Sequence, residues 1–221
     1  MIKRLKIESI IFDLDGTLIN SMHVWEQVDI DFLAKRGLKV PTDLFANMPS
    51  GDGYTAMARY FKEKFKLPET VEMITQEWDS MVYDFYRTLG LREGAFELID
   101  KLHKNSIKLG IGTSNSDALT NVVLEKNDLL KYMAAITTGS NIDRGKPFPD
   151  IYLNVADKIA VDPTKCIVIE DTLHGIQAAK NAGMTAIAIY NDYSKKHEQA
   201  LKESADYFVY DFFQLDSLLF G

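Results

Sequence analysis

The chain has 221 residues, of which 46% are hydrophobic and 26% are charged, as in an ordinary globular protein with one large domain or a core with an insertion. Its formal net charge of −7 argues against non-specific binding to nucleic acid and against docking on an anionic membrane. The single cysteine excludes an intramolecular disulfide, and no apolar run near the N-terminus is long enough for a signal or membrane segment, so we expect a cytoplasmic protein.

The first predicted strand, Ser9–Phe12, leads directly into Asp13-Leu14-Asp15-Gly16-Thr17. Two carboxylates two residues apart at the end of a buried strand repel each other and are costly to desolvate. A cation, a shared proton or a covalent phosphoryl group would offset that cost. Gly16 allows a sharp turn or the close approach of a ligand. This segment is therefore the first candidate site.

From about residue 21 to residue 89 the pattern is helical and contains no convincing buried strand. Helices are predicted at Met22–Arg36, Tyr54–Phe65 and Val71–Arg87. We interpret residues 21–89 as an inserted α-helical cap domain, and residues 1–20 and 90–221 as the α/β core. The apolar residues that we expect inside the cap are Trp25, Phe32, Leu33, Trp78, Val82 and Phe85.

Beyond residue 90, amphipathic stretches alternate with short runs rich in β-branched residues. This alternation indicates βαβ units, so we expect an α/β fold with a doubly wound, mostly parallel sheet and a Rossmann-like core. The predicted helices are Glu93–His103, Asp117–Asn127, Asp150–Ile159, Leu173–Ala182 and Lys195–Lys202. The remaining predicted strands are Ile107–Ile111, Ala134–Thr137, Cys166–Ile169, Thr185–Ile189 and Tyr207–Tyr210.

Polar side chains collect where four of the predicted strands end. In open parallel sheets, ligands bind beyond the carboxyl ends of the strands. Hydroxyls, a lysine and carboxylates at this edge could hold a phosphoryl group beside Mg²⁺, which prefers oxygen ligands. Asp13 and Asp171 are the predicted ligands. In strand order, the polar residues are Asp13 and Asp15, then Thr113, Ser114 and Asn115, then Lys146, then Glu170, Asp171 and Thr172.

These motifs resemble those of the haloacid dehalogenase superfamily, in its phosphatase and β-phosphoglucomutase-like branch, over essentially the whole chain. The segment from Asp13 to Thr17 is similar to the first motif, Thr113 to the second, Lys146 to the third, and Glu170-Asp171 to the fourth. The resemblance implies that Asp13 attacks phosphorus and forms an aspartyl-phosphate. Asp15 would protonate the leaving oxygen and then activate the hydrolytic water.

The same resemblance assigns the other polar groups. Thr113 and the amides of Ser114 and Asn115 would hold phosphoryl oxygens. Lys146 would neutralise charge on the nucleophile and the phosphoryl group. Two purely structural alternatives remain open at this point. Thr113 and Ser114 could cap the next helix, and Thr172 could be an N-cap. The metal ligands would be Asp13, Asp171, Asp15 through its backbone carbonyl, and Glu170 as a further ligand or a structural partner.

Substrate specificity is expected to lie in the cap. The loop from Met48 to Gly53 would face the substrate, and we predict Trp25, Asp52 and Tyr54 as specificity residues. Hinges are expected near Asn20–Met22 and Leu89–Glu93. The leading hypothesis is Mg²⁺-dependent hydrolysis of a small phosphomonoester, such as a sugar phosphate, by a monomer or a weak homo-oligomer.

Three alternatives use the same core. A sugar-phosphate mutase of the β-phosphoglucomutase type would transfer the phosphoryl group between substrate hydroxyls. The cap histidine and loop arginine typical of that mutase fall at Trp25 and near Gly51, which disfavours it. A dehalogenase has no need of Asp15 or of an acidic fourth motif. A phosphate-binding or regulatory protein would not need a matched nucleophile, acid and metal ligand.

Overall fold

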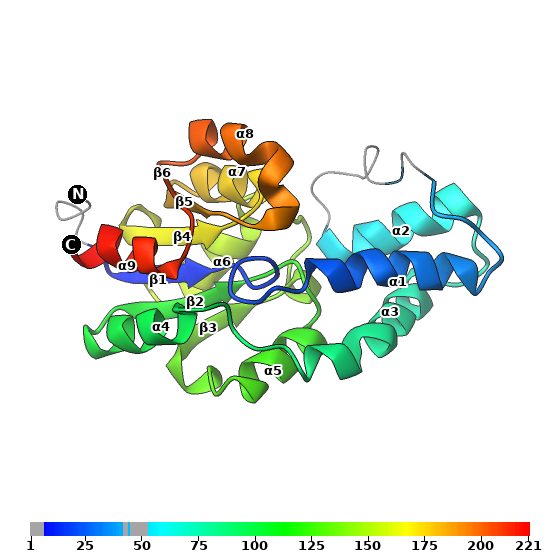
Figure 1. Ribbon diagram of the computed structural model, residues 1–221, viewed down its shortest axis with the longest axis horizontal. Helices are drawn as coiled ribbons and strands as arrows, with labels where there is room; N and C mark the ends of the chain where they lie inside the picture. The colour runs from blue at the N-terminus through cyan, green and yellow to red at the C-terminus, as the bar shows by residue number, and fades with distance from the viewer. Residues whose placement is uncertain (1–6, 42–43, 45–52) are drawn as a thin grey trace.

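The computed structural model describes residues 7–41, 44 and 53–221. Its centre is a six-stranded sheet with the order β3-β2-β1-β4-β5-β6, in which all neighbouring strands are parallel (Figure 1). This order confirms the doubly wound α/β fold expected from the alternating pattern. The strands are β1 (Ser9–Phe12), β2 (Lys108–Gly112), β3 (Met133–Thr137), β4 (Cys166–Glu170), β5 (Thr185–Ile189) and β6 (Tyr207–Val209).

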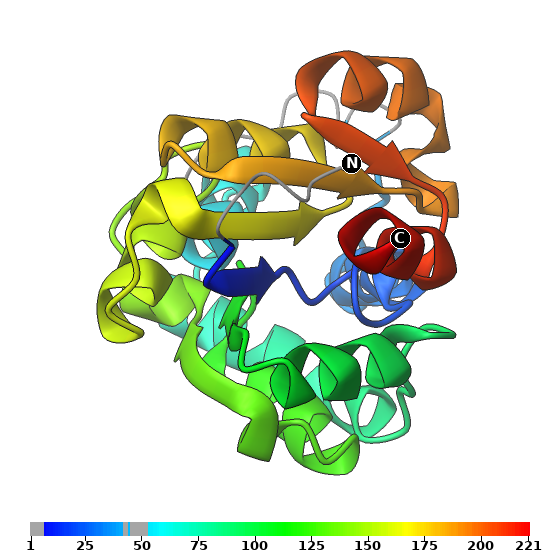
Figure 2. The ribbon, with the colours of Figure 1, turned by 90° about the vertical axis from the view of Figure 1, so that its left-hand side faces the viewer.

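Helices cover both faces of the sheet, as Figure 2 shows. Side chains alternate between the faces, so each face has its own buried apolar cluster. In β1, Ile10 and Phe12 belong to the first cluster and Ile11 to the second. The first face is covered by α4 (Ala95–Lys104), α5 (Asp117–Lys126) and α9 (Phe212–Phe220), and the second by α6 (Asp150–Lys158), α7 (Leu173–Asn181) and α8 (Glu198–Ser204).

Two elements near the C-terminus differ from the prediction. The helix expected at Lys195–Lys202 begins later, because Asn191 caps the 3₁₀ helix η6 (Asp192–His197) before α8 starts. The structure also contains α9, for which we predicted no helix. Its residues are mostly apolar, so periodicity gives little signal, and the mark of its start is Asp211, whose side chain accepts from the N–H of Gln214.

Among the described residues between β1 and the return of the chain to the sheet there are three helices, namely α1 (Met22–Ala34), α2 (Gly53–Phe65) and α3 (Val71–Tyr86). They lie beyond the carboxyl ends of the strands (Figure 1), and we call residues 22–86 the three-helix segment. The rings of Phe32, Phe61 and Trp78, one from each helix, meet edge to face with centroids 5.1, 5.5 and 6.1 Å apart. No helix in the described part of the chain is long and apolar enough to cross a membrane.

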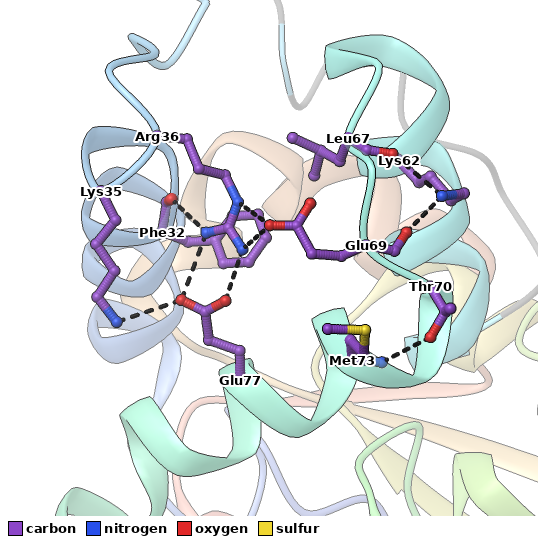
Figure 3. A network of polar contacts seen from close by, with 9 residues as sticks. All are labelled: Phe32, Lys35, Arg36, Lys62, Leu67, Glu69, Thr70, Met73 and Glu77. Atoms are coloured by element: carbon purple, nitrogen blue, oxygen red, sulfur yellow. Dashed lines mark hydrogen bonds and ion pairs between the residues drawn. The ribbon is translucent and has the colours of Figure 1, made fainter.

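An arginine just beyond α1 joins this helix to α3 (Figure 3). Nη2 of Arg36 donates to Oε1 of Glu69 at 2.8 Å and to Oε2 of Glu77 at 2.6 Å. The guanidinium also lies 3.7 Å from the centre of the Phe32 ring. Because Glu69 precedes α3 and Glu77 lies within it, one side chain ties the end of α1 to α3 and to the link before it.

Two chain connections join the three-helix segment to the sheet, and they are bonded to each other. Ile19 and Leu91 form an antiparallel bridge, and the N–H of Arg92 donates to the carbonyl of Leu18 at 2.8 Å. The Arg92 guanidinium donates to the carbonyl of Gly16, also at 2.8 Å. The return of the chain is therefore attached to the turn that follows β1.

Candidate active site

The candidate site lies at the carboxyl end of the sheet, where β1 and β4 are neighbours. After β1 the chain adds β2 and β3 on one side of β1, and after β4 it adds β5 and β6 on the opposite side of the sheet. Asp13 directly follows β1, and its N–H donates to the carbonyl of Ile169 in β4 at 3.0 Å. Glu170 ends β4, and Asp171 follows it. These carboxylates therefore flank a topological switch point, where doubly wound sheets bind their ligands.

A buried lysine joins the ends of the two strands. Lys146 lies in the loop before α6, and its Nζ donates to Oδ1 of Asp13 at 2.5 Å and to Oε1 of Glu170 at 2.6 Å. The side-chain exposure is 7% for Lys146 and Asp13 and 1% for Glu170, so little water competes for these contacts. The Tyr152 hydroxyl of α6 donates to the same Glu170 oxygen at 3.2 Å. Three predicted site residues thus meet from three separate segments.

Burial and neighbouring charges shift the ionisation of this cluster. Burial raises the pKa of Asp13 to about 7, although Lys146 acts in the opposite sense. Burial, together with the charges of Glu170 and Asp13, raises the pKa of Asp171 well above the usual aspartate value. Burial lowers the pKa of Lys146, but the carboxylates outweigh it and leave that pKa well above its usual value. One lysine does not balance three buried carboxylates, so the cluster favours an added cation.

The three carboxylates lie close enough together to share a cation. Asp13, Glu170 and Asp171 each offer an oxygen, and these oxygens lie within 4.8 Å of one another. Mg²⁺ binds oxygen ligands and is held in proteins by a small number of carboxylates. The donor set and its surplus negative charge therefore fit the predicted Mg²⁺.

Glu170 and Asp171 differ in how much of each carboxylate the protein already uses. Oε1 of Glu170 accepts the two hydrogen bonds described above, and its Oε2 accepts from the N–H and the hydroxyl of Thr172 at 2.8 and 2.9 Å. Among the described residues, the only donor to Asp171 is the Thr17 hydroxyl, at 3.2 Å. Asp171 thus keeps more lone pairs for a cation than Glu170 does.

Two glycines allow these carboxylates to lie against the backbone. Gly16 has a φ of +83°, and a Cβ there would lie 2.3 Å from Oδ2 of Asp171. A Cβ at Gly175 would lie 1.8 Å from Oε1 of Glu170. A larger residue at either position would displace the carboxylate.

The hydroxyl of Thr172 accepts from the N–H of Gly175 at 3.1 Å, so this threonine is the N-cap of α7.

Asp15 has a separate set of partners. Oγ of Ser21 donates to Oδ1 of Asp15 at 2.6 Å, and the hydroxyl of Tyr86 donates to the same oxygen. Nδ2 of Asn115 donates to Oδ2 of Asp15 at 2.8 Å. These donors come from the connection before α1, from the last residue of α3 and from the loop after β2. Together they fix the direction of the Asp15 carboxylate.

The loop after β2 places Thr113, Ser114 and Asn115 beside the end of β1. Thr113 is buried, and its hydroxyl accepts from the N–H of Asn115 at 3.2 Å, whereas Ser114 is half-buried. Ser116 caps α5, so helix capping does not account for Thr113 or Ser114. We expected the amide of Asn115 to serve the site, and the structure adds its side chain.

Of the three specificity residues predicted in the helical region, only Trp25 has a described side chain. Trp25 is half-buried, and its Nε1 donates to the hydroxyl of Tyr86 at 2.8 Å. Asp52 lies outside the described residues, together with nearly all of the predicted substrate loop. Tyr54 lies in α2, but its side chain is not among those that the structure describes. The residues at this edge that we did not predict are Ser21, Tyr86, Arg92 and Tyr152.

A cavity of about 340 Å³ opens beside Asp171. It lies between the start of α1, the connection from β4 to α7, and η6, and its lining includes His174, Tyr193 and His197. His174 is exposed and lies in the first turn of α7.

Comparison with known proteins agrees with this geometry. The sequence pattern of the haloacid dehalogenase-like hydrolases matches residues 10–189. The chain belongs to this family. It is similar to (DL)-glycerol-3-phosphatase 2 of Arabidopsis thaliana, with 31% identity over 191 residues that cover 83% of this chain and 79% of the relative. It is also similar to hexitol phosphatase B of Escherichia coli, with 25% identity over 186 residues that cover 83% of this chain and 84% of the relative.

A solved structure shares the fold of this haloacid dehalogenase-like hydrolase. CbbY from Rhodobacter sphaeroides, in complex with phosphate, superposes with a TM-score of 0.82 and 24% identity, over 95% of this chain and 96% of CbbY. Similarity at this level of identity shows a common fold. The family inferred from the motifs and the sheet architecture predicted from the alternating pattern are confirmed.

Proposed function

We propose that this hydrolase removes the phosphoryl group of a small phosphomonoester, such as a sugar phosphate, with the help of Mg²⁺. The observation that carries the proposal is the buried cluster of Asp13, Lys146, Glu170 and Asp171. It offers a nucleophile, a cation and acidic metal ligands in one place. The similarity to two relatives, a glycerol-3-phosphatase and a hexitol phosphatase, supports a small phosphorylated substrate. We expect a monomer or weak homo-oligomer acting in the cytoplasm.

In the first step, a carboxylate oxygen of Asp13 bonds to phosphorus, and the bond from phosphorus to the leaving oxygen breaks. Asp15 gives its proton to that oxygen, and the alcohol departs. Lys146 holds the nucleophilic carboxylate through Oδ1 and balances negative charge on the phosphoryl oxygens. Thr113 and the N–H of Ser114 bind those oxygens.

In the second step, water attacks the aspartyl-phosphate and Asp15 accepts the proton of that water. The bond between phosphorus and Asp13 breaks, which restores the carboxylate and releases inorganic phosphate. Asp171, Asp13 and the backbone carbonyl of Asp15 would hold Mg²⁺, whose contribution is to neutralise charge on the phosphoryl group. Glu170 acts mainly through Lys146, because its own lone pairs are occupied by protein donors.

We propose further that residues 21–89 form a cap domain over this site. The three-helix segment lies beyond the carboxyl ends of the strands (Figure 1). Its two connections, near Asn20–Met22 and Leu89–Glu93, are the natural hinges. Closure would exclude water while Asp13 is phosphorylated, and opening would admit water for the second step.

The mechanism is tested by changing Asp13→Asn and measuring the hydrolysis of p-nitrophenyl phosphate with Mg²⁺. An amide is neither a nucleophile nor a charged ligand, so we expect turnover to fall to the level of a control without enzyme, with the far-UV circular dichroism unchanged. A variant that retained turnover would contradict the role of Asp13.

The substrate class is tested with a panel of phosphorylated metabolites that includes glycerol 3-phosphate, hexitol phosphates and β-glucose 1-phosphate with its bisphosphate activator. Release of inorganic phosphate from polyol or sugar phosphates is the expected result. Rapid isomerisation of β-glucose 1-phosphate with little phosphate release would instead favour the sugar-phosphate mutase.

A further inference from the structure

Tyr86 places a phenol hydroxyl next to the carboxylate that we propose as the acid and base. It is the last residue of α3 and is fully buried. Its hydroxyl donates to Oδ1 of Asp15, and it accepts from Nε1 of Trp25 at 2.8 Å and from Nδ2 of Asn115 at 3.1 Å. A phenol has one proton to donate and two lone pairs to accept with, so every hydrogen-bonding position of Tyr86 is occupied.

The hydroxyl meets Asp15 as a donor, because both of its lone pairs are occupied by the donors of Trp25 and Asn115. The hydroxyl cannot turn toward another acceptor without abandoning the indole N–H of Trp25 or the amide of Asn115. Its direction is therefore set by its neighbours, and it sets the direction of Asp15 in turn.

Each end of the three-helix segment has a donor to the same oxygen. Ser21, at the connection before α1, donates to Oδ1 of Asp15 at 2.6 Å, and Tyr86, the last residue of α3, donates to the same oxygen. Ser21 occupies the N-cap position of α1, yet its side chain makes no capping hydrogen bond. The hydroxyl of Ser21 is used for Asp15 rather than for the helix.

We propose that Tyr86, oriented by Trp25, is a positioning residue for Asp15 and makes proton transfer depend on the placement of the three-helix segment. The inference rests on the proposed function, because it requires Asp15 to serve as the acid and base. Tyr86 touches no reacting atom and acts only by aiming the carboxylate. A small misplacement of a catalytic group is enough to slow a reaction.

The test uses two aryl phosphates that differ in their need for a general acid. Phenolate is a more basic leaving group than p-nitrophenolate, so phenyl phosphate depends more on protonation of the leaving oxygen. kcat/KM reports steps up to the departure of that group. We expect Tyr86→Phe to lower kcat/KM for phenyl phosphate by about tenfold more than for p-nitrophenyl phosphate, with unchanged circular dichroism.

Two variants show whether the effect passes through the proposed residues. Trp25→Phe removes the indole N–H but keeps an aromatic ring, and it should give the same selective loss at smaller size. In an Asp15→Asn background, Tyr86→Phe should cost little more, because the group that it aims is already lost. The matched control is Tyr83→Phe, an exposed tyrosine of α3, which should behave as the wild type.

Equal losses on both substrates, or losses that add fully to Asp15→Asn, would mean that Tyr86 is only structural and would overturn the inference. Failure of the proposed function gives a different pattern: Asp15→Asn would then lack the selective loss, or Asp13→Asn would retain turnover. The two failures are therefore distinguishable.

Discussion

At the scale of the residue, the clearest contrast is between two adjacent carboxylates. Glu170 is enclosed by protein donors on both oxygens, and Lys146 is one of them. Asp171 has the Thr17 hydroxyl as its only donor within the described ranges and lies beside a cavity. A buried carboxylate with few donors gains most from a cation, whereas one with four donors gains least.

We predict that the two carboxylates have different roles: Asp171 binds the metal, and Glu170 places Lys146. Asp171→Asn should weaken Mg²⁺ binding by about 100-fold, because it removes a charged ligand, while Glu170→Gln should weaken it by about tenfold at most. Glu170→Gln should lower kcat at saturating Mg²⁺, because Lys146 loses one of its two anionic partners. Calorimetric titration with Mg²⁺ measures the first effect and steady-state kinetics the second. Equal loss of affinity in both variants would make Glu170 a direct ligand.

Site residues that follow strands could be predicted from the sequence, but the role of Tyr86 could not. Asp13 and Asp171 could be placed because carboxylates just after apolar runs are costly to desolvate without a cation, whereas Lys146 was placed by the resemblance of its loop, between β3 and α6, to the third family motif. Tyr86 stands four residues after Val82 on the buried face of α3, where spacing alone predicts a core residue. What distinguishes it is the meeting of α3 with the turn after β1, and that contact is not local in sequence.

At the scale of the element, the end of α1 is held to α3 by charge. Arg36 and Glu77 are 15% and 28% exposed, and the hydrogen bonds from Arg36 to Glu77 lower the pKa of that carboxyl (Figure 3). A group with a lowered pKa stabilises the folded state above its ordinary pKa, here 4.5, and this contribution is lost as the pH falls through the lowered value.

We predict that Glu77→Gln destabilises the protein by about 1 kcal/mol at pH 7, a value at the upper end for partly exposed ion pairs. The difference from the wild type should shrink toward zero at an acid pH below the lowered pKa of Glu77, where the wild-type carboxyl is itself neutral. Urea unfolding at both pH values measures it, with the exposed Glu63 of α2 changed to Gln as the control. A difference that stayed constant with pH would mean that Glu77 stabilises the helices by packing rather than by charge.

The bounds of a strand or helix can be predicted from the sequence where local sequence patterns determine them. β1 and β5 begin and end where they were predicted, because β-branched runs with buried residues on both faces have few alternatives. The start of α8 and the whole of α9 were missed. In the first case a 3₁₀ turn capped by Asn191 takes the place of the first helical turn. In the second, the nine residues of α9 are mostly apolar, so the sequence shows little of the polar and apolar alternation from which a helix is predicted.

At the scale of the whole molecule, the three-helix segment and the sheet share one apolar cluster. Phe32, Phe61 and Trp78 belong to the same cluster as Ile10 and Phe12 of β1. The helix α3 also packs against α5, where Oγ of Ser116 donates to Oδ1 of Asp79 at 3.1 Å. The proposed hinge motion therefore has to leave this shared cluster largely intact, so that the segment and the sheet unfold together.

We therefore predict a single unfolding transition. Both tryptophans of the chain, Trp25 and Trp78, lie in the three-helix segment, so their fluorescence reports that segment while far-UV circular dichroism reports the whole chain. The two probes should give the same melting midpoint. Phe61→Ala, which removes a buried ring between the helices, should lower both midpoints together by about 10 °C. If the fluorescence midpoint alone fell, the segment would unfold by itself, and the shared cluster would not couple it to the sheet.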